Sequence, residues 1–107
     1  MVRPPIVPAP ERVDDLGAGL GPQWLDDYLE QCLAELIRLR RRVHAHPELG
    51  HRESATTALI MRVLDADGIK ASVLPSGTGV IAEIGSGERL VGLRADIDAL
   101  PIRESTG

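Results

Sequence analysis

The stretch from Arg89 to Ile97 constrains the fold most, because apolar residues fall on both faces of the strand expected there. These residues are Leu90, Val91, Leu93, Ala95 and Ile97. A strand that is apolar on both faces is normally central in a sheet that is covered on both sides. The rest of the sequence offers only two expected helices and two further strands as cover. We therefore expect the chain to be the first part of a larger α/β domain.

Two helices are expected before the strands. Apolar residues recur at three- and four-residue steps over 24–43, which predicts an amphipathic helix that begins near Pro22. This helix should end before the His46-Pro47 pair, because the residue before a proline is pushed out of the α region. A second helix is expected over 54–66, with Glu53 or Ser54 as its cap.

Strands are expected over 69–74, 80–84 and 89–97, separated by short links that contain glycine. Links of this length suit hairpins, whereas a parallel crossover needs a dozen or more residues. The sequence therefore predicts an α/β fold in which two helices lie on one face of a three-stranded, mainly antiparallel sheet. Residues 1–21 contain four prolines within the first ten positions. We expect them to form a disordered tail, or else a peptide that docks on another surface.

Composition narrows the classes of partner. Twelve basic and sixteen acidic residues give a net charge of −4, so phosphate and anionic lipid are not attracted in bulk. Aromatic residues make up 2%, which argues against a platform for stacking nucleic-acid bases. No apolar run approaches the roughly 18 to 20 residues that span a bilayer. We expect a cytoplasmic protein with neither nucleic-acid nor membrane partners, and its lone Cys32 excludes an intrachain disulfide.

Two carboxylates, Asp96 and Asp98, end the third expected strand and should project to the same side. Side by side they repel each other unless a cation or an arginine relieves them. Ligands bind at the carboxyl ends of strands in open α/β sheets, so metal coordination or support of a metal ligand is one interpretation. The other is an ion pair with Arg94 or a turn cap, and spacing alone favours it.

His44, His46 and Glu48 form a second cluster that looks like a metal site. However, they fall where a helix ends, and a metal cage needs three or four converging ligands. We favour local capping and hydrogen bonding for this cluster, and we assign no role to His51.

Residues 39–107 resemble the amino-terminal portion of the amidohydrolase branch of the aminoacylase/carboxypeptidase metallopeptidase family, which includes hippurate and auxin-conjugate hydrolases. The segments that carry the resemblance are 42–50, Glu53 with Thr57, 77–80, 94–102 and 104–107. It implies that residues 22–107 are the incomplete amino-terminal part of a zinc-peptidase-like catalytic domain. The complete protein would be a metal-dependent hydrolase that cleaves amide bonds of N-acyl amino acids or small peptides.

The resemblance also assigns roles to the two aspartates. Asp98 takes the position of a carboxylate that supports a metal ligand. Asp96 stands where the wider family carries a ligand histidine, so it is a weak candidate ligand. This branch takes its ligands from a Cys-Gly-His motif, a Glu-Glu pair and histidines in later segments. The resemblance therefore implies zinc, manganese or cobalt in the complete enzyme. This chain alone should bind no metal tightly and should be inactive. The complete enzyme could form a homo-oligomer.

The alternative is a non-catalytic remnant that acts as a protein interaction module through an exposed sheet face and edge. The reading frame beyond Gly107 distinguishes the two interpretations. Codons for Cys-Gly-His would support the enzyme, and a stop codon would support the remnant.

Overall fold

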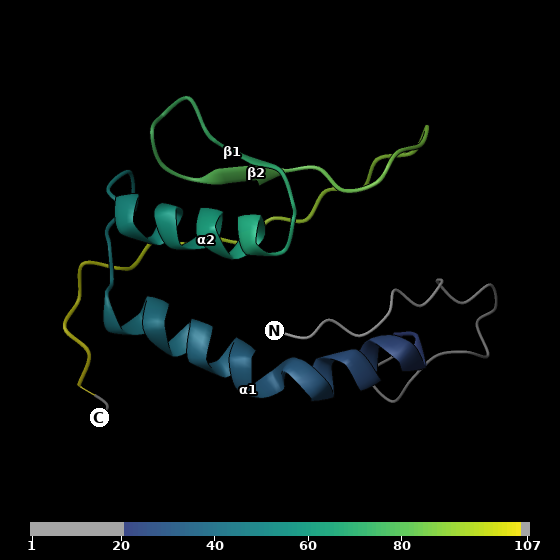
Figure 1. Ribbon diagram of the computed structural model, residues 1–107. Helices are drawn as coiled ribbons and strands as arrows, with labels where there is room; N and C mark the ends of the chain where they lie inside the picture. Colours follow the sequence, from purple (N-terminus) through teal and green to yellow (C-terminus); the bar gives the residue numbers. More distant parts are fainter. Residues whose placement is uncertain (1–20, 106–107) are drawn as a thin grey trace. The chain divides into compact units, whose positions relative to one another are not determined.

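The structure, a computed structural model, describes residues 21–105. Its elements follow in the order α1 (Gln23–Ala45), α2 (Ser54–Ala66), β1 (Ala71–Val73) and β2 (Val80–Ala82) (Figure 1). The chain divides into two units between residues 42 and 43, so that most of α1 belongs to the first unit. The tail expected over 1–21 lies, except for Gly21, outside the described residues.

α1 confirms the helix that the apolar periodicity predicts. It begins after Pro22, whose carbonyl accepts the N–H of Leu25 at 2.9 Å. It ends at Ala45, ahead of Pro47, because the residue before proline leaves the α region. No residue of α1 is buried. None of the helices in the described part of the chain is long and apolar enough to cross a bilayer.

α2 and the hairpin of β1 and β2 pack together in the second unit (Figure 1). The strands are antiparallel, with Ser72 opposite Ile81, which confirms the expected hairpin. α2 ends at Ala66, and Gly68 follows it with a φ of 70°, the left-handed conformation that glycine favours after a helix. Within residues 21–105, Leu59 of α2 is the one buried hydrophobic side chain.

The turn between β1 and β2 depends on glycine at one position. Gly79 has a φ of 86°, and its carbonyl accepts the N–H of Leu74 at 3.0 Å. A Cβ at residue 79 would lie 2.8 Å from Cδ1 of Leu74. A side chain at this position would therefore meet both backbone strain and a steric clash.

The expectation of a third strand over 89–97 is corrected. The described residues form a sheet of two strands, β1 and β2, and residues 89–97 belong to neither. β2 ends at Ala82, so no neighbouring ladder reaches the N–H and C=O groups of these residues. A strand forms only where those groups find partners, whatever its side chains favour. The apolar side chains are consequently exposed, with Leu90 at 89%, Val91 at 86% and Leu93 at 100%.

The exposed run predicts that the chain binds hydrophobic dyes. Replacing Leu90 and Leu93 together by serine should lower the fluorescence of a bound dye, because it removes the most exposed apolar side chains of the run. Ile84→Ser is the matched control, since Ile84 is 80% exposed but has no large apolar neighbour in sequence. An unsubstituted chain that binds no dye would contradict this expectation.

Candidate functional site

The structure brings Asp98 beside the segment that follows α1. The N–H of Ala99 donates to the carbonyl of Glu48 at 2.7 Å, and Leu49 and Ala99 form a parallel bridge. Oδ2 of Asp98 lies 3.5 Å from where a Cβ would stand on Gly50. Two motif segments that are far apart in sequence are therefore in contact, and the Asp98 residue itself remains exposed.

The carboxylate of Glu48 caps the first turn of α2. Its Oε1 accepts the backbone N–H and the hydroxyl of Thr56, each at 2.6 Å, and its Oε2 accepts the N–H of Ala55 at 3.1 Å. A negative charge is stabilised at this end of a helix, where the N–H groups have no partner within the helix. The Thr56 hydroxyl and the Thr56 and Ala55 N–H groups hold the pKa of Glu48 below its usual value.

This finding corrects the expected cap. Glu53 is the residue at the N-cap position, but its side chain makes no capping hydrogen bond. Its carboxylate instead accepts the N–H of His51 at 3.0 Å. His51 has a φ of 65°, where the chain reverses direction sharply. Its own backbone N–H, the Thr78 hydroxyl and the His51 N–H lower the pKa of Glu53. Local capping, the interpretation favoured for the histidine cluster, is thus confirmed for Glu48.

Thr57 ties the β1–β2 turn to α2. Its buried hydroxyl oxygen accepts the N–H of Gly79 at 2.9 Å. Thr78, the residue before Gly79, reaches the Glu53 carboxylate from the same turn. The resemblance singled out Glu53, Thr57 and 77–80 without saying what joins them, and the structure shows that hydrogen bonds do.

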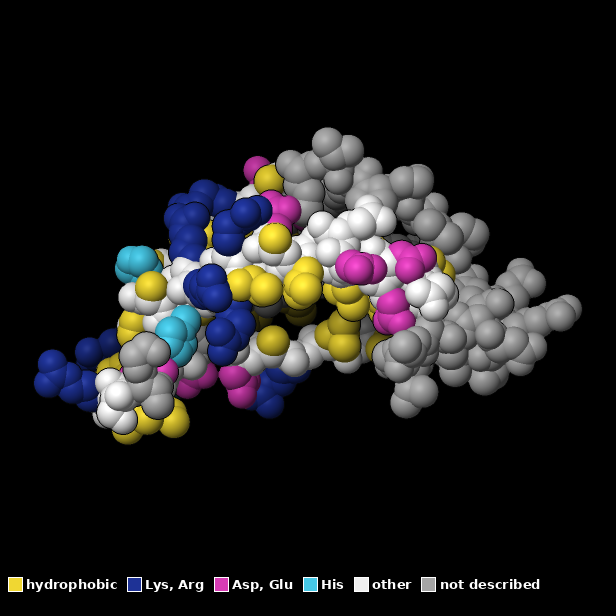
Figure 2. Space-filling view, turned by 90° about the horizontal axis from the view of Figure 1, so that it is seen from below, with side chains coloured by type: hydrophobic (Ala, Val, Ile, Leu, Met, Phe, Trp, Pro, Cys, Tyr) yellow, Lys and Arg dark blue, Asp and Glu magenta, His cyan; other side chains and the backbone are white. Residues whose placement is uncertain are grey.

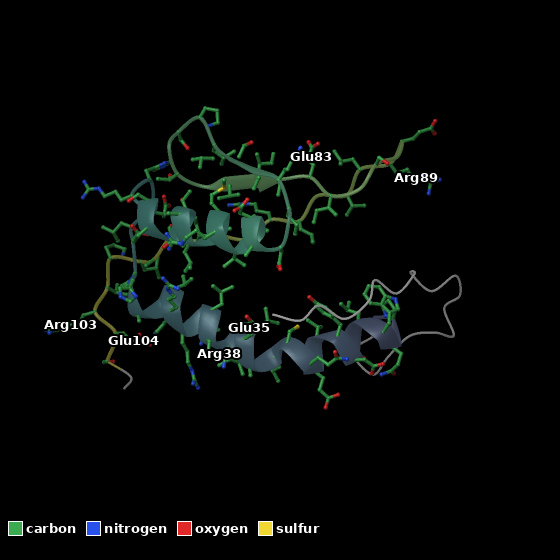
Figure 3. All side chains as sticks on the ribbon, viewed as in Figure 1. Glu35, Arg38, Glu83, Arg89, Arg103 and Glu104 are labelled. Atoms are coloured by element: carbon green, nitrogen blue, oxygen red, sulfur yellow. The ribbon has the colours of Figure 1, made fainter. Side chains whose placement is uncertain are left out.

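The remaining charged motif residues lie at the surface. Nε2 of His44 lies 2.7 Å from Oε2 of Glu104, which Figure 3 labels, and both side chains are more than half exposed. Nη2 of Arg94 lies 2.8 Å from Oδ1 of Asp96. The arginine pair, one of the two interpretations of the aspartates, is therefore confirmed for Asp96. Sequence reasoning missed the His44–Glu104 pair, since nothing local links residues so far apart.

The described residues do not fit a metal cage. No three of the histidine, cysteine, aspartate and glutamate side chains within 21–105 come close enough together to hold an ion. Asp96 forms an ion pair with Arg94. Asp98 lies close to Gly50, which has no side chain that could bind a metal. These residues can position one exposed carboxylate, but they cannot by themselves activate a water on a metal.

Comparison with known proteins finds relatives that match part of this chain. No family model and no solved structure matches the chain. IAA-amino acid hydrolase ILR1-like 2 of Arabidopsis thaliana is 49% identical over 70 residues, which are 64% of this chain and 16% of that protein. N-acetyl-L-cysteine deacetylase of Bacillus subtilis is 48% identical over 76 residues, which are 68% of this chain and 18% of that protein.

A third relative carries a different name. A Rhodococcus jostii protein, provisionally named glutamate–cysteine ligase 2-3, is 43% identical over 75 residues, which are 68% of this chain and 9% of that much longer protein. The hydrolase and deacetylase relatives confirm the resemblance to the amidohydrolase branch over the matched segment. The chain spans less than a fifth of the length of each of these three relatives.

Thr57→Val tests the link between α2 and the turn. Valine keeps the shape of the side chain but removes the acceptor for the Gly79 N–H, which is then left without its partner. We expect the free energy of unfolding to fall by about 1–3 kcal/mol, measured by denaturant titration. Thr57→Ser, which keeps the hydroxyl, is the control and should lose less. Equal losses in the two variants would mean that packing, not the hydrogen bond, is what matters.

The lowered pKa values of Glu48 and Glu53 predict a stability that depends on pH. Both groups have pKa values below 4.5 in the folded chain, so their stabilisation is complete above the unfolded value and is lost as the pH falls through the folded values. The melting temperature should therefore decline below about pH 4.5. Glu48→Gln should melt at a lower temperature at neutral pH and show a shallower acid decline. Glu83→Gln is the control, because Glu83 is an exposed glutamate that directly follows β2.

Proposed function

We propose that residues 22–107 are the amino-terminal part of a metal-dependent amidohydrolase that cleaves the amide bond of N-acyl amino acids or small peptides. Its main support is the identity of 48–49% to two relatives whose names describe an amino-acid conjugate hydrolase and an N-acetyl-L-cysteine deacetylase. The alternative, a non-catalytic interaction module, draws no support from these relatives. The complete protein would be cytoplasmic, with a small-molecule amide as its substrate and no nucleic-acid or membrane partner.

In this proposal Asp98 is the carboxylate that supports the catalytic centre. Its neighbour Ala99 is held by the Glu48 carbonyl, and Gly50 leaves room for the Asp98 carboxylate. The side chain is exposed, so segments that follow residue 107 in a complete enzyme could approach it. Asp96 is a weaker candidate, because the Arg94 guanidinium already offsets its charge.

The divalent metal of the complete enzyme, zinc, manganese or cobalt, would polarise the amide and activate a water. Its ligands and the general base are assigned to later segments, since the described residues do not assemble a cage. The contribution of this chain is then to hold one carboxylate in place. Later segments of the larger α/β domain would also cover the apolar side chains of residues 90–93.

A segment exchange tests the proposal. The 76-residue segment of the Bacillus subtilis N-acetyl-L-cysteine deacetylase that matches this chain is replaced by the corresponding residues of this chain. We expect the hybrid to deacetylate N-acetyl-L-cysteine. Asp98→Asn in the hybrid should lower turnover or metal affinity by about 10- to 100-fold, as loss of a carboxylate that orients a metal ligand does. Asp96→Asn is the matched control and should cost less.

Three results would contradict different parts of the proposal. A hybrid that folds, shown by a cooperative melt, but has no activity would reject the amidohydrolase assignment. Undiminished turnover in Asp98→Asn would reject only the role of that residue. Tight stoichiometric metal in the 107-residue chain, measured by elemental analysis, would reject the placement of the ligands in later segments.

A further inference from the structure

Glu48 connects the start of α2 with the segment that carries Asp98. Its carbonyl accepts the N–H of Ala99 at 2.7 Å, and the adjacent Leu49 forms a parallel bridge with Ala99. Figure 1 shows the chain after β2 returning past the link between α1 and α2. The place of Asp98 is therefore set by where the backbone of residues 48–50 lies.

The Glu48 side chain fixes that backbone relative to α2. Both carboxylate oxygens are occupied, Oε1 by the N–H and hydroxyl of Thr56 and Oε2 by the N–H of Ala55. Hydrogen bonds to an ionised carboxylate are stronger than those between neutral groups, so they hold this flexible side chain in one orientation. Gly50 then leaves room for Asp98, since a Cβ there would lie 3.5 Å from its Oδ2.

No ion pair fixes Asp98 within the described residues, where Arg94 is paired with Asp96 instead. Figure 2 shows basic side chains toward one end of α1 and acidic side chains toward the other. The basic end carries the arginines of residues 38–42, which belong to the first unit of the chain. The placement of Asp98 therefore depends on the backbone contact with Glu48.

Resting on the proposed function, in which Asp98 supports the metal centre, we propose that Glu48 is a positioning residue for Asp98. Its carboxylate sets the distance from α2 to the backbone of residues 48–50, and its carbonyl transmits that placement to Ala99. Glu48 touches neither substrate nor metal and acts through Asp98. A displacement of about 1 Å can cost on the order of 100-fold in rate, so an anchor outside the centre affects turnover.

Hydrogen exchange of single amides, measured by NMR in this chain, tests the anchor without any activity. Glu48→Ala removes the carboxylate but keeps the carbonyl that accepts the Ala99 N–H. We expect the Ala99 amide to exchange about tenfold faster, because local opening of its segment becomes easier. Glu48→Gln, which keeps the length of the side chain, should give a smaller increase.

Thr57→Val is the matched control for this measurement. It removes the acceptor of the Gly79 N–H, so it should accelerate exchange at Gly79 without a comparable change at Ala99. Unchanged exchange at Ala99 in Glu48→Ala, or equal acceleration in Thr57→Val, would overturn the proposal.

A double-mutant cycle in the hybrid deacetylase tests whether Glu48 acts through Asp98. Glu48→Ala should lower kcat about tenfold with little change in KM, because it displaces a group that acts on the metal centre. In a hybrid that already carries Asp98→Asn, Glu48→Ala should cost little more, since the group it positions is absent. Thr57→Val should keep the kcat of the folded hybrid.

The outcomes separate this inference from the proposed function. A folded hybrid without activity contradicts the proposed function, and hydrogen exchange at Ala99 still decides whether Glu48 anchors its segment. Full turnover in Asp98→Asn rejects the role of Asp98 and the positioning role with it. Equal losses of kcat from Glu48→Ala with and without Asp98→Asn would overturn the positioning role alone, because Glu48 would then act independently of Asp98.

Discussion

Glu48 holds the described part of the second unit together through two different groups. Its carboxylate satisfies N–H groups at the start of α2, and its backbone carbonyl accepts the N–H of Ala99. The side chain thereby fixes where the helix begins, while the main chain fixes where the segment carrying Asp98 runs. Because one residue makes both contacts, the start of α2 and the placement of Asp98 are linked.

Hydrogen bonds carry much of the organisation that a hydrophobic core supplies in a larger domain. Within the described residues, Glu53, Thr56 and Thr57 are buried, and Leu59 is the single hydrophobic side chain that joins them. Buried polar groups are stabilising only when each finds a partner. The bonds from Thr56 to Glu48 and from Gly79 to Thr57 meet this requirement. The motif residues of the amidohydrolase resemblance therefore have a structural reason to occur together.

The helices and the hairpin could be predicted from sequence because their causes are local. Apolar periodicity predicts α1, the His46-Pro47 pair ends it, and Gly68 lies just after the end of α2. The third strand could not be predicted correctly, since a strand depends on a neighbour that the pattern of its own side chains does not supply. The cap of α2 was missed for a related reason: Glu48 lies eight residues before Thr56, outside the range of local capping patterns.

The candidate site shows the same division between local and distant causes. The pairing of Arg94 with Asp96 spans two residues, and spacing alone favoured it. The approach of Asp98 to Gly50 joins segments on opposite sides of α2 and the hairpin, so only the fold reveals it. The two aspartates thus differ in environment although they are two residues apart. Asp96 has the Arg94 guanidinium beside it, whereas the backbone next to Asp98 is fixed by the hydrogen bond from Ala99 to Glu48. This difference is why the proposed function assigns the supporting role to Asp98 rather than to Asp96.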